Sequence, residues 1–279
     1  MTGDWLPAAG RALGGPVRVI GREPAHGGYA SGSVERVELD VGGRAVPVVV
    51  KQASPVEVAA LRARAVVRGI GPLRLLAVAG DRIVLTHHAG TALADGAPVP
   101  DAVWAELGGV HAHWRGRRPR GVPVVDRAYW RGLCDRTLVA VRGALARTGD
   151  DAFTVAEQLV SAWRDDPRIA RALATLPRTL VHGDPHRGNI LTGPDGAVLI
   201  DWGNARVAPA ALDLAVLRAQ GAQVPAALAA TTSEQERDWA DVHANVQYLG
   251  FACDHLGAPR VREMVAAAEG ATARLAACG

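Results

Sequence analysis

The sequence predicts an α+β fold in which a strand-rich first third precedes a helix-rich remainder. Two observations indicate this fold class. Up to about residue 86, apolar residues alternate with polar ones or form short runs, whereas after residue 101 they recur at helical spacing over long stretches. The change of pattern places a boundary near residue 90. We therefore expect one unit over residues 1–90, built on an antiparallel sheet with one helix, and a helical unit over residues 91–279.

Composition and charge exclude several classes of protein. The chain has 279 residues, of which 49% are apolar and 21% charged, as in a globular protein with a substantial core. It has no run of about 18 apolar residues and no basic start followed by an apolar stretch, so we expect neither a membrane span nor secretion. Three scattered cysteines, in no CxxC pair, favour a reducing cytoplasm over a disulfide framework or zinc cluster. A net charge of +3 is too small to indicate a nucleic-acid partner.

The first two strands are expected at Glu35–Asp40 and Val46–Lys51, joined by the tight turn Gly42-Gly43. Lys51, at the end of the second strand, is the only lysine among 31 basic residues. An ammonium is a compact point charge that the planar guanidinium of arginine does not reproduce. The position is therefore a candidate functional site, with chance as the alternative.

A capped helix is expected directly after Lys51. Ser54 stands at the cap, Pro55 at the first helical position, and Glu57 three residues after the serine. Glu57 also borders the apolar face that contains Leu61, so the capping carboxylate and a functional carboxylate are both open interpretations. Strands around Leu73–Val78 and Arg82–Thr86 follow, and residues 86–90 are expected to form a linker.

Long helices dominate the rest of the chain. They are expected at Val103–His113, Trp130–Arg147, Thr154–Leu176, Ala211–Gln220, Ser233–Leu256 and Arg260–Ala277.

The segment L-V-H-G-D-P-H-R-G-N-I-L-T-G-P-D-G-A-V-L-I-D-W, from Leu180, contains the most informative pattern. Two short apolar runs flank the turn sequence G-P-D-G, and pairing them as a hairpin brings Asn189 beside Asp201. Asp184 lies five residues before Asn189, in a loop that can return to the same place. Carboxylate and amide oxygens suit a hard cation such as Mg²⁺.

H-G-D-P-H-R-G-N followed by L-I-D-W is similar to the pattern of the aminoglycoside phosphotransferase and choline kinase superfamily, HGDxxxxN and then a strand ending in Asp. The spacing from Asp to Asn also occurs in the catalytic loop of protein kinases. The resemblance implies a protein-kinase-like fold of two lobes. The N-terminal lobe would be an antiparallel sheet with one helix, and the C-terminal lobe mainly helical with a catalytic hairpin.

The same resemblance implies roles for the candidate residues. Asp184 would orient the acceptor hydroxyl and receive its proton, while Asn189 and Asp201 would bind Mg²⁺. Lys51 would contact the α- and β-phosphates of ATP, and Glu57 would pair with Lys51. These groups supply the positioning and charge neutralisation that phosphoryl transfer requires.

Further residues receive supporting roles by resemblance. The small-residue loop over residues 27–33 would approach the nucleotide, although most glycine-rich loops are plain turns. Its candidate residues and those of the hinge at about 86–90 are Ser31, Gly32, Ser33, Thr86, His87 and His88. The residues expected to organise the catalytic loop are His182, His186 and Asp213.

The sequence pattern that would indicate acceptor-binding residues is weaker. Within Ser233–Leu256 a polar stripe either faces a polyhydroxylated or cationic acceptor or is an ordinary solvated face. Its members are Asp238, Asp241, Asn245 and Tyr248. The chain also departs from the family at Gly203 and Ala208-Pro209, where an acidic residue and a Gly-Asp pair are common. We expect these departures to affect the loop near the nucleotide or acceptor rather than the metal pair.

The resemblance implies an ATP- and Mg²⁺-dependent O-phosphotransferase that acts on a hydroxyl of a small molecule, such as an antibiotic or related natural product. The alternatives are a peptide Ser/Thr kinase of natural-product maturation and a metabolic kinase for an amino alcohol or sugar. An alternative of another class is a nucleotide-binding regulatory module without turnover.

Overall fold

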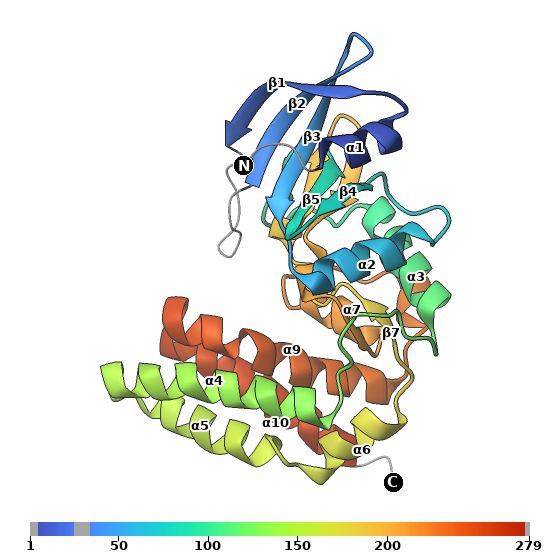
Figure 1. Ribbon diagram of the computed structural model, residues 1–279. Helices are drawn as coiled ribbons and strands as arrows, with labels where there is room; N and C mark the ends of the chain where they lie inside the picture. Colours follow the sequence, from blue (N-terminus) through green and yellow to red (C-terminus); the bar gives the residue numbers. More distant parts are fainter. Residues whose placement is uncertain (1–4, 25–33, 277–279) are drawn as a thin grey trace.

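The structure is a computed structural model that describes residues 5–24 and 34–276 (Figure 1). The predicted nucleotide-loop residues Ser31, Gly32 and Ser33 lie outside the described residues. Within them, a five-stranded sheet and helices α1 and α2 form the N-terminal part, and helices dominate the rest, which confirms the predicted α+β class.

The N-terminal sheet is antiparallel throughout, with strand order β1-β2-β3-β5-β4. The elements of this part are α1 (Leu6–Leu13), β1 (Val17–Pro24), β2 (Val34–Val41), β3 (Arg44–Gln52), α2 (Pro55–Ala65), β4 (Leu75–Ala79) and β5 (Arg82–Thr86). The predicted turn between β2 and β3 is confirmed. Gly42 and Gly43 have φ angles of 60° and 85°, a conformation that glycine adopts without a steric cost.

Helix α2 begins as its sequence predicts. The side chain of Ser54 accepts a hydrogen bond of 3.2 Å from the backbone N–H of Glu57, and Pro55 occupies the first helical position. This start fixes where Glu57 lies relative to β3, the strand that carries Lys51.

Five helices gather at the end of the molecule opposite the sheet (Figure 1). They are α4 (Arg127–Thr148), α5 (Asp151–Trp163), α6 (Pro167–Thr175), α9 (Glu234–His255) and α10 (Gly257–Ala276). The prediction of one continuous helix over Thr154–Leu176 is wrong. Asp166 caps a new helix by accepting a hydrogen bond of 2.8 Å from the N–H of Arg168, and Pro167 occupies its first position. A proline lacks the N–H that a continuous helix would need there.

The remaining elements are β6 (Thr91–Ala92), α3 (Asp101–Trp114), β7 (Thr179–Val181), η1 (Arg187–Asn189), β8 (Ile190–Gly193), β9 (Gly196–Leu199), η2 (Trp202–Asn204), β10 (Arg206–Ala208), α7 (Ala211–Arg218) and α8 (Ala226–Ala229). Of these, α3, β7 and α7 lie between the sheet and the five helices in Figure 1. Strands β8 and β9 form the predicted hairpin, with Ile190 opposite Leu199. Strand β6 pairs with β8, so the chain passes from the sheet to the hairpin between Thr86 and Thr91.

One hydrophobic cluster joins the sheet side to the helical side. It includes Leu61 of α2, Ile83 of β5, Leu107 of α3 and Ile190 of β8, each at most 3% exposed. Close packing of this kind restricts relative movement of the elements that carry the candidate site. Within residues 5–24 and 34–276, no helix has the length and hydropathy needed to cross a membrane.

Candidate active site

Lys51 lies between two carboxylates that come from different parts of the fold. Its Nζ is 2.9 Å from Oε1 of Glu57 on α2 and 3.1 Å from Oδ1 of Asp201, just after β9. The side chains of Lys51 and Glu57 are only 12% and 4% exposed, whereas that of Asp201 is 47% exposed. Burial lowers the pKa of Lys51, but the two carboxylates outweigh this effect and raise it above its ordinary value. The site therefore holds a permanent cation next to an accessible carboxylate.

The loop between β7 and η1 presents Asp184. The amide Nδ2 of Asn189 donates a 2.9 Å hydrogen bond to the backbone carbonyl of Asp184, and the N–H of His186 donates to the same oxygen at 2.9 Å. Gly183 has a φ of 81°, and a Cβ there would lie 2.2 Å from the carbonyl oxygen of Asn204. The loop therefore requires glycine immediately before the candidate catalytic carboxylate.

Both carboxylate oxygens of Asp184 accept hydrogen bonds from side chains. Nδ2 of Asn204, in η2, donates to Oδ2 at 2.9 Å. The hydroxyl of Tyr248, on α9, donates to Oδ1. Three segments far apart in the sequence thus meet at one carboxylate.

His182 links the Asp184 loop to the strand that leads to Asp201. Its Nε2 donates a 2.9 Å hydrogen bond to the carbonyl of Ile200, and its Nδ1 accepts one of 3.3 Å from the N–H of Asp184. These partners require the neutral tautomer with the proton on Nε2. Burial lowers the pKa of His182, which is consistent with a neutral ring. His186 is more exposed, and its Nδ1 accepts a bond of 3.0 Å from the N–H of Gly188 at the start of η1.

Asp213 is fully buried below the same loop. Its carboxylate accepts hydrogen bonds from the N–H groups of His182 and Gly183 at 2.9 and 2.8 Å, and lies 2.8 Å from Nε2 of His111. Burial raises the pKa of Asp213, but the hydrogen bond and charge of His111 and the backbone donors reverse the direction and lower it. An ionised acceptor therefore holds the backbone on the N-terminal side of Asp184.

The hairpin brings Asn189 and Asp201 to one end, as its sequence predicts. The N–H of Ile200 donates a 2.8 Å hydrogen bond to the carbonyl of Asn189, which places Asp201 one residue beyond this contact. Asp201 has a φ of 62°, the only positive φ of a non-glycine residue in the described part of the chain. One carboxylate with one amide oxygen fits Mg²⁺, which takes few protein ligands and completes its shell with water and phosphate. Among the residues that the structure describes, no group of three or more His, Cys, Asp or Glu side chains could hold a metal.

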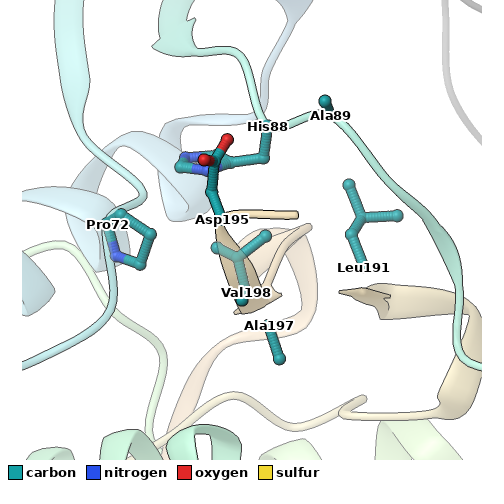
Figure 2. A pocket seen from close by; sticks show the side chains of 8 residues that line it. Pro72, His88, Ala89, Leu191, Asp195, Ala197 and Val198 are labelled. Carbon is teal, nitrogen blue, oxygen red and sulfur yellow. The ribbon is translucent and has the colours of Figure 1, made fainter. Parts of the chain in front are cut away.

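The candidate hinge residues meet the hairpin at a small pocket. His88 and Ala89 of the candidate hinge and Leu191, Asp195 and Val198 of the hairpin line it together (Figure 2). Burial lowers the pKa of the imidazoles of both His87 and His88. Nε2 of His88 lies 3.0 Å from the hydroxyl of Thr86, which in turn accepts a 3.0 Å hydrogen bond from the N–H of Arg74. The side chains of Thr86 and His88 therefore contact each other, and that of Thr86 also bonds the residue just before β4.

Of the four predicted acceptor residues, the structure brings only Tyr248 to Asp184. Asp238 forms an ion pair of 2.6 Å with Arg274 on α10, and Asp241 pairs with Arg218 on α7. Nδ2 of Asn245 donates a 2.8 Å hydrogen bond to the carbonyl of Asp241, one turn earlier in the helix.

Three residues at the site have no counterpart among the predicted ones. Asn204 follows Gly203, one of the departures from the family pattern, and bonds Asp184 directly. Nη2 of the buried Arg206 donates to the carbonyl of Gly183 at 2.9 Å, and Nε2 of Gln247 donates to the same oxygen at 3.0 Å. The departure at Gly203 was the only sequence signal near Asn204, and nothing distinguished Arg206 among the arginines of the chain.

Comparison with solved structures identifies the fold. A protein assigned as a fructosamine-3-kinase from Thermobifida fusca is 20% identical, with a TM-score of 0.61, over 96% of this chain and 98% of that chain. A choline kinase from Cryptosporidium parvum is 10% identical, with a TM-score of 0.58, over 94% and 88%. A thermostable mutant of an aminoglycoside phosphotransferase, in complex with ADP and hygromycin B, is 16% identical, with a TM-score of 0.51, over 96% and 95%. The predicted protein-kinase-like fold is confirmed.

Comparison of sequences identifies the family. No curated protein sequence matches the chain. A model of the phosphotransferase enzyme family, however, matches residues 32–244. This range contains Lys51, Asp184 and Asp201 and covers well over half of the 279 residues. The chain belongs to the phosphotransferase enzyme family, which confirms the prediction of a phosphate-transferring enzyme.

Proposed function

We propose that the protein is an ATP- and Mg²⁺-dependent kinase that transfers the γ-phosphate of ATP to a hydroxyl of a small molecule. The observation that carries this proposal is the meeting of Lys51, Glu57 and Asp201 in one ion-pair network. His182 connects this network to the loop of Asp184. A cation that can bind phosphate and a carboxylate that can orient a hydroxyl are thus held by elements that are linked to each other. Phosphoryl transfer requires such fixed positions.

In the proposed reaction the acceptor hydroxyl donates a hydrogen bond to the carboxylate of Asp184 and points its oxygen at the γ-phosphorus of ATP. A bond forms between that oxygen and phosphorus, and the bond from phosphorus to the oxygen bridging the β- and γ-phosphates breaks. Asp184 receives the hydroxyl proton, and ADP leaves. The main role of Asp184 in this proposal is to align the acceptor hydroxyl.

Lys51 binds the phosphates as a cation in this proposal. Its ammonium is held between two carboxylates and stays charged, so it is available to the α- and β-phosphates without a proton transfer. Glu57, fixed by the start of α2, keeps the flexible side chain of Lys51 in one position. The backbone of residues 86–90 is the proposed contact for the adenine ring, near the pocket lined by Ala89 and Leu191.

Asn189 and Asp201 are the proposed holders of Mg²⁺. When bound there, the ion would neutralise charge on the phosphates. Asp201 is the more exposed of the two carboxylates beside Lys51, and the hairpin keeps it next to Asn189. Two protein ligands would leave most of the coordination shell to phosphate and water oxygens, which is the coordination that Mg²⁺ usually adopts in proteins.

The experiment that tests the proposal measures ADP release by the purified protein with Mg·ATP and a panel of hydroxyl acceptors. The panel contains aminoglycoside and aminocyclitol antibiotics, choline, ethanolamine, a ketosamine and a serine-containing peptide. We expect one small-molecule class to raise ADP release above the rate with water alone, with the acceptor gaining the mass of one phosphate. Binding of ATP without turnover on any acceptor would contradict the proposal and favour a regulatory module.

A further inference from the structure

The carboxylate of Asp184 is held from both sides before any substrate arrives. Tyr248 donates to Oδ1 and Asn204 donates to Oδ2, at 2.9 Å for the latter. An aspartate carboxylate otherwise turns over a broad range about χ2, because this torsion has no sharp staggered wells. Two donors on opposite oxygens restrict that rotation and fix the plane of the carboxylate.

The hydroxyl of Tyr248 stays protonated and donates its hydrogen bond to Asp184. Burial raises the pKa of its phenol well above the ordinary value, and the charge of Asp184 and the hydrogen bond to it act in the same direction. The phenol therefore keeps its proton and points it at Oδ1 of Asp184. Each carboxylate oxygen has two lone pairs, so an acceptor hydroxyl can still approach the one that Tyr248 leaves open.

The backbone around this contact is also held in place. Gln247, the neighbour of Tyr248 on α9, donates to the carbonyl of Gly183, and Arg206 donates to the same oxygen. Helix α9 thus holds the catalytic loop at two consecutive residues, once at the backbone of Gly183 and once at the side chain of Asp184.

We propose that Tyr248 and Asn204 are positioning residues for phosphoryl transfer: their two hydrogen bonds fix the plane of the Asp184 carboxylate, so that its open lone pair meets the acceptor hydroxyl. The inference rests on the proposed function, because it takes Asp184 as the carboxylate that orients the hydroxyl. Tyr248 would then position the catalytic carboxylate, in addition to its predicted role as an acceptor-binding residue.

The test compares Tyr248→Phe with the wild type. This variant keeps the ring and removes only the hydroxyl. ADP release from Mg·ATP is measured with water as the acceptor and with the panel compound that raises the rate most. We expect kcat to fall by about tenfold to a hundredfold, because a small misalignment at the reacting centre has effects of this size. The KM for ATP should stay within about twofold, since the hydroxyl that is removed bonds Asp184 and not Lys51, the proposed phosphate-binding residue.

The split between kcat and the KM for ATP provides a readout that a loss of packing would not give. A positioning role lowers kcat and leaves the KM for ATP unchanged, whereas a loosened fold weakens ATP binding as well. We expect the same split in Asn204→Ala. An unchanged kcat in Tyr248→Phe would overturn the proposal.

The matched control is Thr137→Val. The hydroxyl of Thr137 donates a 3.0 Å hydrogen bond to the carbonyl of Val246 on α9 and is buried. Its loss removes one hydrogen bond to the same helix, two residues before Tyr248, without touching Asp184. This variant should keep the wild-type kcat and KM for ATP. A fall in kcat equal to that of Tyr248→Phe would mean that loosening α9 accounts for the effect, and the positioning role would be rejected.

A second measurement needs no acceptor. The chain has 3 tyrosines, so labelling with 3-fluorotyrosine gives few ¹⁹F resonances, and Tyr248→Phe identifies one of them. That resonance should shift in Asp184→Asn, and an unmoved resonance would refute the contact itself. Failure of the proposed function looks different, because Asp184→Asn would then keep full turnover. If only the positioning role fails, Asp184→Asn loses turnover and Tyr248→Phe does not.

Discussion

Nζ of Lys51 lies 3.1 Å from Oδ1 of Asp201, although 150 positions separate the two residues in the chain. The contact joins the sheet to the hairpin and makes the only lysine of the sequence part of a site. Lys51→Arg should therefore lower kcat/KM for Mg·ATP by at least about tenfold, since the wider planar fork misplaces the phosphates. Steady-state kinetics over a range of ATP concentrations measures the effect. The charge is kept, so the melting temperature should change little. Wild-type kinetics of Lys51→Arg would show that the reaction does not require a lysine at this position.

Asp201 combines a charge with an unusual backbone, and asparagine separates the two. Asparagine tolerates the left-handed conformation at φ of 62°, so Asp201→Asn removes the charge without backbone strain. We expect the Mg²⁺ concentration for half-maximal rate to rise by at least about tenfold. A Mg²⁺ titration of ADP release measures it. Asp40→Asn, which removes a surface carboxylate paired with Arg18, is the control and should leave the titration unchanged. Equal titrations of Asp201→Asn and the wild type would exclude Asp201 as a metal ligand.

Much of this site could be predicted from the sequence because it depends on local patterns. The glycine turn, the Ser54 cap and the G-P-D-G hairpin each specify their own geometry, and together they deliver Lys51, Glu57 and Asp201. The resemblance to the family then supplied roles that geometry alone does not. The break before Pro167 was also readable in principle, since Asp166-Pro167 is a helix start, but the apolar periodicity on both sides masked it.

Contacts between distant side chains could not be predicted in this way. The helical period puts Asp238, Asp241 and Tyr248 in one stripe of α9, but periodicity does not say what lies opposite each residue. The partners of the two aspartates are arginines on α10 and α7, and the partner of Tyr248 is the catalytic loop. Packing of the helices decides these pairings.

Asp213 should be more important for stability than its single carboxylate suggests. Asp213→Asn keeps the size but replaces an acceptor oxygen by an N–H₂ group that faces the N–H groups of the loop or His111. We expect the free energy of unfolding to fall by about 3 kcal/mol, because a buried pair is broken and donors lose their acceptor. Urea unfolding followed by circular dichroism measures it. Asp241→Asn, in a partly exposed pair with Arg218, should cost less than about 1 kcal/mol. Equal losses in the two variants would contradict the bracing role.

His243 should make the protein less stable in acid. The ring is fully buried among Tyr129, Trp130 and Trp239, and neither nitrogen has a hydrogen-bonding partner in the described part of the chain. Burial, followed by the charge of Arg206, holds the pKa of His243 well below 6.5. The unfolded chain therefore binds a proton that the folded protein excludes. The free energy of unfolding should fall as the pH drops below about 6.5, by up to about 1.4 kcal/mol per pH unit for this group.

His243→Leu removes that titration. Urea unfolding from pH 8 to pH 5 should give a flatter acid side in the variant, while the difference between variant and wild type stays constant above about pH 7.5, where the imidazole is neutral in both states. Parallel curves over the whole range would show that His243 does not contribute to the acid sensitivity.

The most direct test of the account is phosphate transfer by Asp184→Asn. This variant keeps the size of the side chain and an oxygen that can accept, but loses the charge that receives the hydroxyl proton. The measurement is the transfer of ³²P from [γ-³²P]ATP to the panel acceptor that gives the highest rate, with ATP binding followed in parallel. The account predicts that transfer falls by at least about a hundredfold, while ATP binding stays near that of the wild type. Transfer at the wild-type rate would contradict the assignment of Asp184 and, with it, the proposed mechanism.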